Sequence, residues 1–198
     1  MGASKLKLGL VHVRRTSTRY YELDREHLYH MTAMRHLKDR ESKQVIREFI
    51  SHFPSAADLL NLTKQLEELP MEDASVFFAD GKPWILRTKG ILIPSLKFDA
   101  FITSLPKIIV DMGAVPHIAN GAPIMRPGIR QLEGHFSKGD LVAILDERHR
   151  KTLALGVTEM DSETMQMVTK GRVIDNIHYV GDLVWNLLAR RVPSSTHG

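Results

Sequence analysis

The chain has 198 residues, of which 43% are hydrophobic and 25% are charged, the composition of an ordinary globular protein. It contains no cysteine, so the sequence excludes disulfides and thiolate metal sites. No apolar run is long enough to span a membrane, and the N-terminus lacks the apolar segment of a signal peptide. We therefore expect a cytoplasmic protein with no membrane contact.

The net charge of +4 is unevenly distributed along the chain. Residues 1–40 hold nine basic and four acidic residues, whereas residues 41–198 hold 18 basic and 19 acidic residues. Any nucleic-acid binding by the near-neutral body must therefore come from a local patch. Residues 1–38 are predicted to form a basic extension, either a strand or a partly disordered arm, and the sequence leaves open whether residues 1–30 are native.

A small α/β domain is predicted over residues 39–105, and its helices follow the apolar spacing. The first helix begins near Asp39 and ends before Pro54. A second is expected from Ala56 to Leu69, where leucines recur at helical intervals. A third is expected from Ser95 to Ser104.

The same domain carries a strong hairpin signal. Two apolar runs, 75–79 and 84–88, flank Asp80-Gly81, a dipeptide that favours the tight turns of β-hairpins. A short strand at 91–93 is expected to follow the hairpin.

Pro106 is predicted to open a second domain, which extends to residue 188 and is followed by a polar tail at 189–198. A short helix is expected at 162–170, with Ser162 as its cap. Six short strands favour a closed or nearly closed mixed barrel. The expected strands are Ile108–Asp111, Pro123–Met125, Asp140–Leu145, Thr152–Glu159, Val173–His178 and Leu183–Leu188.

The segment Ile109–Ile129 is unusually rich in small residues. An apolar strand leads into Gly113-Ala114, a short helix follows, and Asn120-Gly121-Ala122 precedes a second strand. Small residues allow a close backbone approach, which suits either tight turns or a groove for a nucleic-acid backbone. Both alternatives remain open.

Three segments in order resemble the PUA domain, a small RNA-binding fold. They are Val110–Ile129, Phe136–Val142 with its Lys-Gly-Asp turn, and the buried strand Ala154–Val157. Each segment is weak alone, but the set is specific.

The resemblance narrows to one branch of PUA proteins. Asp175–Tyr179, the Leu-Val-Trp at 183–185, and the upstream Phe53-Pro54 and Ile93–Leu96 are similar to the malignant T-cell-amplified-sequence and ligatin translation factors and to archaeal PUA proteins. The resemblance implies an α+β fold, in which a small N-terminal α/β domain precedes a PUA-like mixed β pseudo-barrel with short helices. It also implies RNA as a partner (tRNA or rRNA), with the small ribosomal subunit and a partner like the density-regulated protein.

An RNA-contact surface is expected around the small-residue segment, where donors beside backbone amides could follow phosphates. Arg126 is the favoured cation; Lys138 and Arg172 could equally be turn or solvent-exposed charges. The candidate RNA-binding residues are Gly113, Ala114, His117, Asn120, Gly121, Ala122, Arg126, Lys138 and Arg172.

No residue pattern predicts catalysis. A P-loop, a GxGxxG motif and a nucleophile elbow are all absent from the sequence. Asn176, His178 and Tyr179 are interpreted as structural residues at a strand end. His27 and His30 have helical spacing and His36 follows, but no fourth ligand lies at a useful spacing, so we expect no metal and no cofactor.

We therefore predict a non-enzymatic RNA-binding protein that acts in translation initiation or re-initiation. Two alternatives remain: an accessory RNA-recognition module for an enzyme that modifies tRNA or rRNA, and a protein–protein interaction module.

Overall fold

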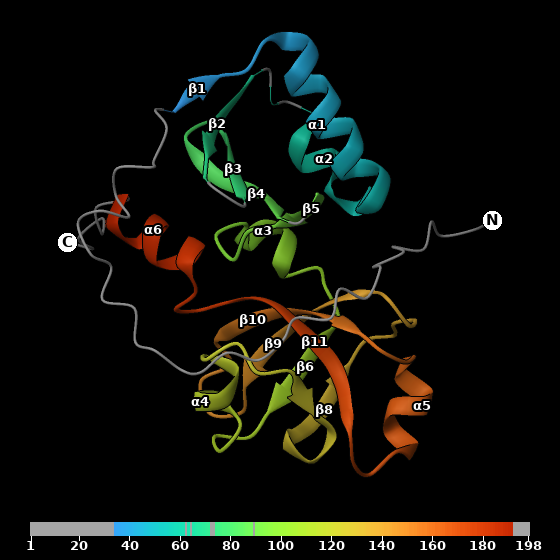
Figure 1. Cartoon of the computed structure of the whole chain (residues 1–198). Coiled ribbons are helices and arrows are strands. Elements are labelled where there is room, and N and C mark those ends of the chain that lie inside the picture. Colours follow the sequence, from blue (N-terminus) through green and yellow to red (C-terminus); the bar gives the residue numbers. More distant parts are fainter. Residues whose placement is uncertain (1–33, 62, 64, 72–73, 89, 192–198) are drawn as a thin grey trace. The chain divides into compact units, whose positions relative to one another are not determined.

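In the computed structural model, residues 34–191 are described except for 62, 64, 72–73 and 89. The predictions for His27, His30 and most of the basic extension lie outside the described residues. Backbone contacts divide the chain into two compact units, Met1–Ile93 and Pro94–Gly198 (Figure 1). Within the part of the chain that is described, no helix is long and apolar enough to cross a membrane.

The first unit contains a five-stranded sheet in the order β1-β2-β3-β4-β5. Its strands are β1 (Arg35–His36), β2 (Leu66–Pro70), β3 (Ala74–Ala79), β4 (Lys82–Thr88) and β5 (Ile91–Pro94). The predicted hairpin is confirmed, because β3 and β4 pair antiparallel around Asp80-Gly81. Both turn residues have positive φ, +50° and +74°, as such a turn requires.

Helix α1 (Asp39–His52) forms where the sequence predicts it. The Glu41 carboxylate accepts a hydrogen bond from the backbone N–H of Lys38 at 2.9 Å, which satisfies one of the donors at the helix start. Val45 and Phe49 are buried on one face. After Phe53, the chain continues through η2 (Pro54–Ala56) and α2 (Ala57–Leu60).

The predicted helix over Ala56–Leu69 is wrong beyond Leu60, because Leu66–Pro70 forms β2. Leu66 and Leu69 are fully buried, so their spacing reflects burial in a sheet rather than a helix face. Pairing with strands on both sides overrides the helical preference of the leucines. A buried hydroxyl strengthens this arrangement, since Ser42 Oγ of α1 accepts the backbone N–H of Leu66 at 3.1 Å.

The second unit is a mixed six-stranded sheet with short helices, which confirms the predicted fold class (Figure 1). Its strand order is β7-β11-β10-β9-β6-β8, and β6 is parallel to β9 while the other pairs are antiparallel. The strands are β6 (Lys107–Val110), β7 (Ile124–Met125), β8 (Ile129–Glu133), β9 (Leu141–Asp146), β10 (Thr152–Thr158) and β11 (Arg172–Tyr179). The helices are α3 (Asp99–Ile102), α4 (Val115–Ile118), η3 (Arg126–Gly128), α5 (Ser162–Met167) and α6 (Leu183–Arg191).

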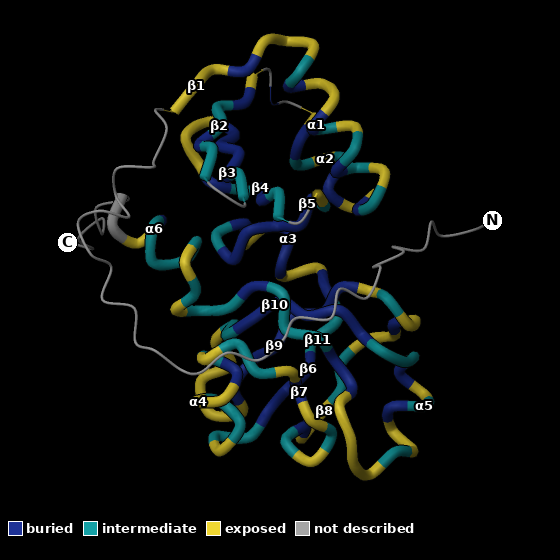
Figure 2. Tube along the Cα trace, in the orientation of Figure 1, coloured by how far each residue is buried: buried dark blue, intermediate teal, exposed yellow. Residues whose placement is uncertain are grey.

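The sheet curls around an apolar core. The outer strands β7 and β8 follow each other in the chain through η3, so the curled sheet is a pseudo-barrel. All six residues of β9 are buried, and Ala154–Thr158 of β10 are buried too, as Figure 2 shows. The core includes Ile108, Val110, Ile118, Ile124, Ile129, Phe136, Val142, Ile144, Ala154, Met165, Val173 and Ile174.

The secondary structure of this unit differs from the sequence prediction at two segments. Leu183–Leu188 was expected to be a strand, but it lies in α6, whose first turn is capped by Asp182. The segment 129–133, which is not among the strands expected from sequence, is the edge strand β8. Ile129 is buried while its neighbour Arg130 is exposed, so only one face of this strand carries an apolar signal.

Two predicted helices are shorter than expected. The helix expected at 95–104 forms only at Asp99–Ile102, and the one expected at 162–170 ends at Met167. Asp161, not Ser162, caps α5, because its carboxylate accepts the N–H of Thr164 at 2.7 Å.

Candidate nucleic-acid interface

The connection from β6 to β7 holds six of the nine candidate residues. It begins at Asp111, whose Oδ1 accepts the backbone N–H of Ala114 at 2.8 Å. The Asp111 N–H in turn donates to the carbonyl of Gly128 at 2.9 Å. A Cβ added at Gly128 would lie 3.1 Å from the Cβ of Ala114, so the two backbones approach closely here. Gly113 and Ala114 are therefore held in place at the start of α4.

The Asn120-Gly121-Ala122 turn packs directly on β11. Asn176 Nδ2 donates to the carbonyls of Ile118 and Ala122 at 3.0 and 3.2 Å. Gly121 has φ +79°, and a Cβ added there would lie 2.8 Å from the hydroxyl oxygen of Tyr179. Burial raises the pKa of the Tyr179 phenol, and the nearby Asp182 carboxylate raises it further. Gly121 thus serves turn geometry, and Asn176 and Tyr179 have the structural roles that the sequence predicts.

Replacing Gly121 with alanine is expected to lower the free energy of unfolding by about 3 kcal/mol. Alanine would be strained at φ +79° and would collide with the Tyr179 ring. Gly90→Ala is the matched control, because Gly90 has the same φ of +79° with no atom within 4 Å of the added Cβ. Urea denaturation of both variants measures the difference. Equal losses would show that the Tyr179 contact contributes nothing.

His117 and Asn120 place polar groups on the outer side of this rigid connection. Both side chains are exposed. The Asn120 amide nitrogen donates to the Pro116 carbonyl at 2.9 Å, which orients the side chain. The His117 imidazole makes no hydrogen bond to any described residue, while its carbonyl accepts the N–H of Ala122 at 3.0 Å. These two side chains are available to a ligand on a scaffold that is already fixed.

The three candidate cations lie apart from this connection. Arg126 is half-buried, and its guanidinium donates to the carbonyls of Met165 and Ile129 at 2.7 and 3.2 Å. Arg172 forms ion pairs with Glu159 and Asp175 at the start of β11. Lys138 is exposed in the turn before β9. Arg126, the cation favoured from sequence, is thus occupied by structural contacts, and its role in RNA binding stays a prediction.

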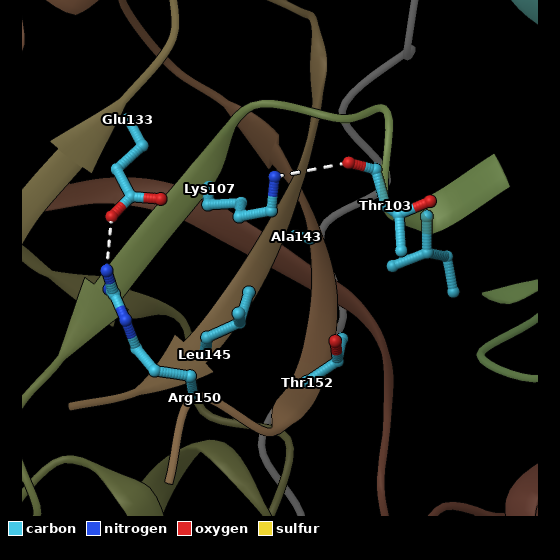
Figure 3. Close-up of a pocket in the computed structure, with 8 residues that line it drawn as sticks. Thr103, Lys107, Glu133, Ala143, Leu145, Arg150 and Thr152 are labelled. Atoms are coloured by element: carbon cyan, nitrogen blue, oxygen red, sulfur yellow. Dashed lines mark hydrogen bonds and ion pairs between the residues drawn. The ribbon is translucent and has the colours of Figure 1, made fainter. Parts of the chain in front are cut away.

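A cavity of about 380 Å³ lies on another part of the second unit (Figure 3). Its cations are already compensated, because Lys107 Nζ donates to the Thr103 carbonyl at 3.1 Å and Arg150 pairs with Glu133. None of the nine candidate residues lines it. The cavity is therefore not part of the predicted interface.

One basic cluster was not among the residues predicted from sequence. The turn between β9 and β10 carries Arg148, His149, Arg150 and Lys151, all exposed. The sequence signal that predicts this cluster is a run of four consecutive side chains that are basic or carry an imidazole. The preceding Asp146 is only 4% exposed.

Comparison with known proteins matches residues 106–180 to the PUA domain model. Translation machinery-associated protein 20 of Saccharomyces cerevisiae is 30% identical over 70% of this chain and 83% of its own length. The chain belongs to the PUA-domain family of translation machinery-associated protein 20. Human malignant T-cell-amplified sequence 2 is similar as well, at 28% identity over 76% of this chain and 89% of its own length.

A solved structure agrees with this family assignment. A PUA domain protein from Aeropyrum pernix has a TM-score of 0.63 at 25% identity and covers 79% of this chain and 91% of its own. The resemblance inferred from sequence is therefore confirmed. All nine candidate residues fall inside the matched PUA domain. The domain boundaries expected at 38/39, 105/106 and 188/189 stay predictions.

Proposed function

We propose that this PUA-family protein is a non-enzymatic RNA-binding protein that acts in translation by binding tRNA or the small ribosomal subunit. Two things support the proposal: the RNA-binding character of the PUA fold, and a family whose members are named for the translation machinery. The observation that carries it is the pair of exposed side chains, His117 and Asn120, on a rigidly braced connection.

This connection suits the recognition of unpaired RNA. Proteins that read single-stranded ends and loops use flat side chains and hydrogen-bond donors held in a fixed geometry. His117 supplies a ring, and Asn120 supplies an oriented amide. Because residues 106–180 hold nine basic and nine acidic residues, affinity must depend on local contacts more than on general attraction.

The test is binding of fluorescently labelled tRNA to the full chain, compared with the double variant His117→Ala/Asn120→Ala. We expect affinity to fall by about tenfold or more, since one lost hydrogen bond of about 1.4 kcal/mol corresponds to tenfold. His135→Ala/Asn61→Ala removes the same residue types from exposed positions that are not part of the connection and should bind like the wild type.

Co-sedimentation with small ribosomal subunits tests the other half of the proposal. If the wild type binds neither tRNA at low salt nor the subunit, the proposed function is wrong. A partner like the density-regulated protein and a cytoplasmic location are part of the same proposal. Pull-down of that partner and cell fractionation would test them.

A further inference from the structure

The buried carboxylate of Asp146 holds the turn between β9 and β10 in one conformation. The Asp146 carboxylate is 4% exposed and accepts the backbone N–H groups of His149 and Lys151, the latter at 2.9 Å. Burial raises the pKa of Asp146, but the backbone donors of the turn outweigh it and hold that pKa below its ordinary value. Arg150 adopts the left-handed conformation, with φ +55°, and its N–H donates to the Asp146 carbonyl at 3.1 Å. We call residues 148–151 the basic turn.

Acidic groups near the basic turn are already engaged. Glu147 accepts the backbone N–H of Met112 at 3.1 Å, and it also contacts Arg130 at 3.8 Å. Asp111 pairs with the same Arg130 at 3.1 Å. Arg148 and Lys151 form no ion pair or side-chain hydrogen bond with any residue that the structure describes. Arg150 of the turn is paired with Glu133, so Arg148 and Lys151 carry the uncompensated positive charge of the basic turn, on a domain whose total charge is zero.

The basic turn lies beside the β6–β7 connection. Strands β6 and β9 are parallel with Val110 opposite Asp146, so both segments leave the same end of the pseudo-barrel. The backbone N–H of Glu147 donates to the Val110 carbonyl at 2.9 Å. The Glu147 side chain then reaches Met112, next to Gly113. The candidate interface and the basic turn thus form neighbouring parts of one end of the domain.

We propose that the basic turn is a second RNA-contact site, which binds backbone phosphates of the same RNA that the β6–β7 connection recognises. This inference rests on the proposed function. Unpaired cationic side chains on a backbone held in one conformation suit phosphate contacts, and such contacts position an RNA without reading its sequence. The connection would supply recognition, and the basic turn would supply the salt-dependent part of the affinity.

The test compares Arg148→Gln/Lys151→Gln with the wild type in tRNA binding at several salt concentrations. Each phosphate contact contributes about 0.7 to the slope of log affinity against log salt for single strands. We expect the double variant to lose about 1.4 of that slope. Affinity for tRNA of different sequences should fall by a similar factor. Since both side chains are exposed and unpaired, the melting temperature should stay unchanged.

Arg40→Gln/Lys43→Gln is the matched control, because it removes one arginine and one lysine from exposed positions of α1. An unchanged slope in Arg148→Gln/Lys151→Gln, or an equal change in the control, would overturn the inference. If His117→Ala/Asn120→Ala weakens binding and the basic-turn variant does not, the inference fails while the proposed function stands. If the wild type binds no RNA, both fail.

An acidic protein segment is the alternative occupant of the basic turn. Labelled polyglutamate provides a direct probe. If Arg148→Gln/Lys151→Gln loses polyglutamate binding while its tRNA affinity and salt slope match the wild type, the basic turn is assigned to an acidic protein and the inference is wrong.

Discussion

Gly156→Ala is expected to destabilise the pseudo-barrel by about 3 kcal/mol. Gly156 is buried in the centre of β10, and a Cβ added there would lie 2.4 Å from Ile174 Cγ2 and 2.9 Å from the Asp175 carbonyl oxygen. The second contact is with backbone, so it cannot be relieved by rotating a side chain. Relief would require β10 and β11 to separate at the irregularity in their register between Leu155 and Gly156.

Chemical denaturation followed by circular dichroism measures this loss. Gly113→Ala is the control, because Gly113 is exposed and its added Cβ would meet only the Asp111 side chain, at 3.3 Å. The control should change the free energy of unfolding by about 0.5 kcal/mol or less. A Gly156→Ala variant as stable as the control would show that the two strands adjust without cost.

Local patterns were sufficient for much of the fold. The hairpin at Asp80-Gly81 and the buried strand Ala154–Val157 follow from turn residues and apolar runs within a few positions of each other. The resemblance to PUA proteins rested on the order of such local segments. The order of these segments can be recognised even where the secondary structure of an individual segment is predicted wrongly.

Elements that depend on long-range pairing could not be predicted in the same way. The run at Leu183–Leu188 contains residues that favour strands, but Asp182 provides a helix cap, and no strand among the described residues pairs with the run. The reverse holds for β8. Its exposed Arg130 and Gln131 are typical of a loop, and only its pairing with β6 makes the segment a strand. Sequence spacing alone shows neither that the run at Leu183–Leu188 lacks a pairing strand nor that β8 has one.

In the candidate site, too, local sequence patterns reveal some features, and long-range contacts determine the others. The small residues at 113–122 were recognised from sequence, and the structure gives the reason for one of them in the contact between Gly121 and Tyr179. The hydrogen bond that engages the Arg126 guanidinium could not be predicted, because the Met165 carbonyl that accepts it is 39 positions away in the sequence. Likewise, only the folded structure shows that Asp146 is buried against the backbone of the basic turn and that Arg148 and Lys151 form no ion pair with a described residue.

Asp182→Ala is expected to lower the free energy of unfolding at neutral pH by about 3 kcal/mol. The Asp182 carboxylate accepts the backbone N–H groups of Trp185 and Tyr179 at 2.7 and 3.1 Å, and it also binds Nδ1 of His178. His178 is only 2% exposed. Removing the carboxylate therefore uncaps α6 and leaves a buried imidazole nitrogen without its partner.

The loss should depend on pH in a defined direction. Burial raises the pKa of Asp182, but hydrogen bonding and charge interaction with His178, together with the backbone donors, hold that pKa below its ordinary value of 3.8. A carboxyl group with a lowered pKa in the folded state stabilises fully above its ordinary pKa and stops doing so as the pH falls through the lowered value. The difference between wild type and Asp182→Ala should thus narrow below about pH 4.

Asp182→Asn separates charge from capping. Asparagine keeps an oxygen that can accept the Trp185 N–H but lacks the negative charge, so it resembles the protonated aspartic acid. The Asn variant should be less stable than the wild type at pH 6 and should approach it near pH 2, whereas the Ala variant should remain less stable than both. A deficit in Asp182→Asn that stays constant from pH 6 to pH 2 would show that the carboxylate charge does not stabilise the fold. In that case the contribution of Asp182 would come from its hydrogen-bond geometry alone.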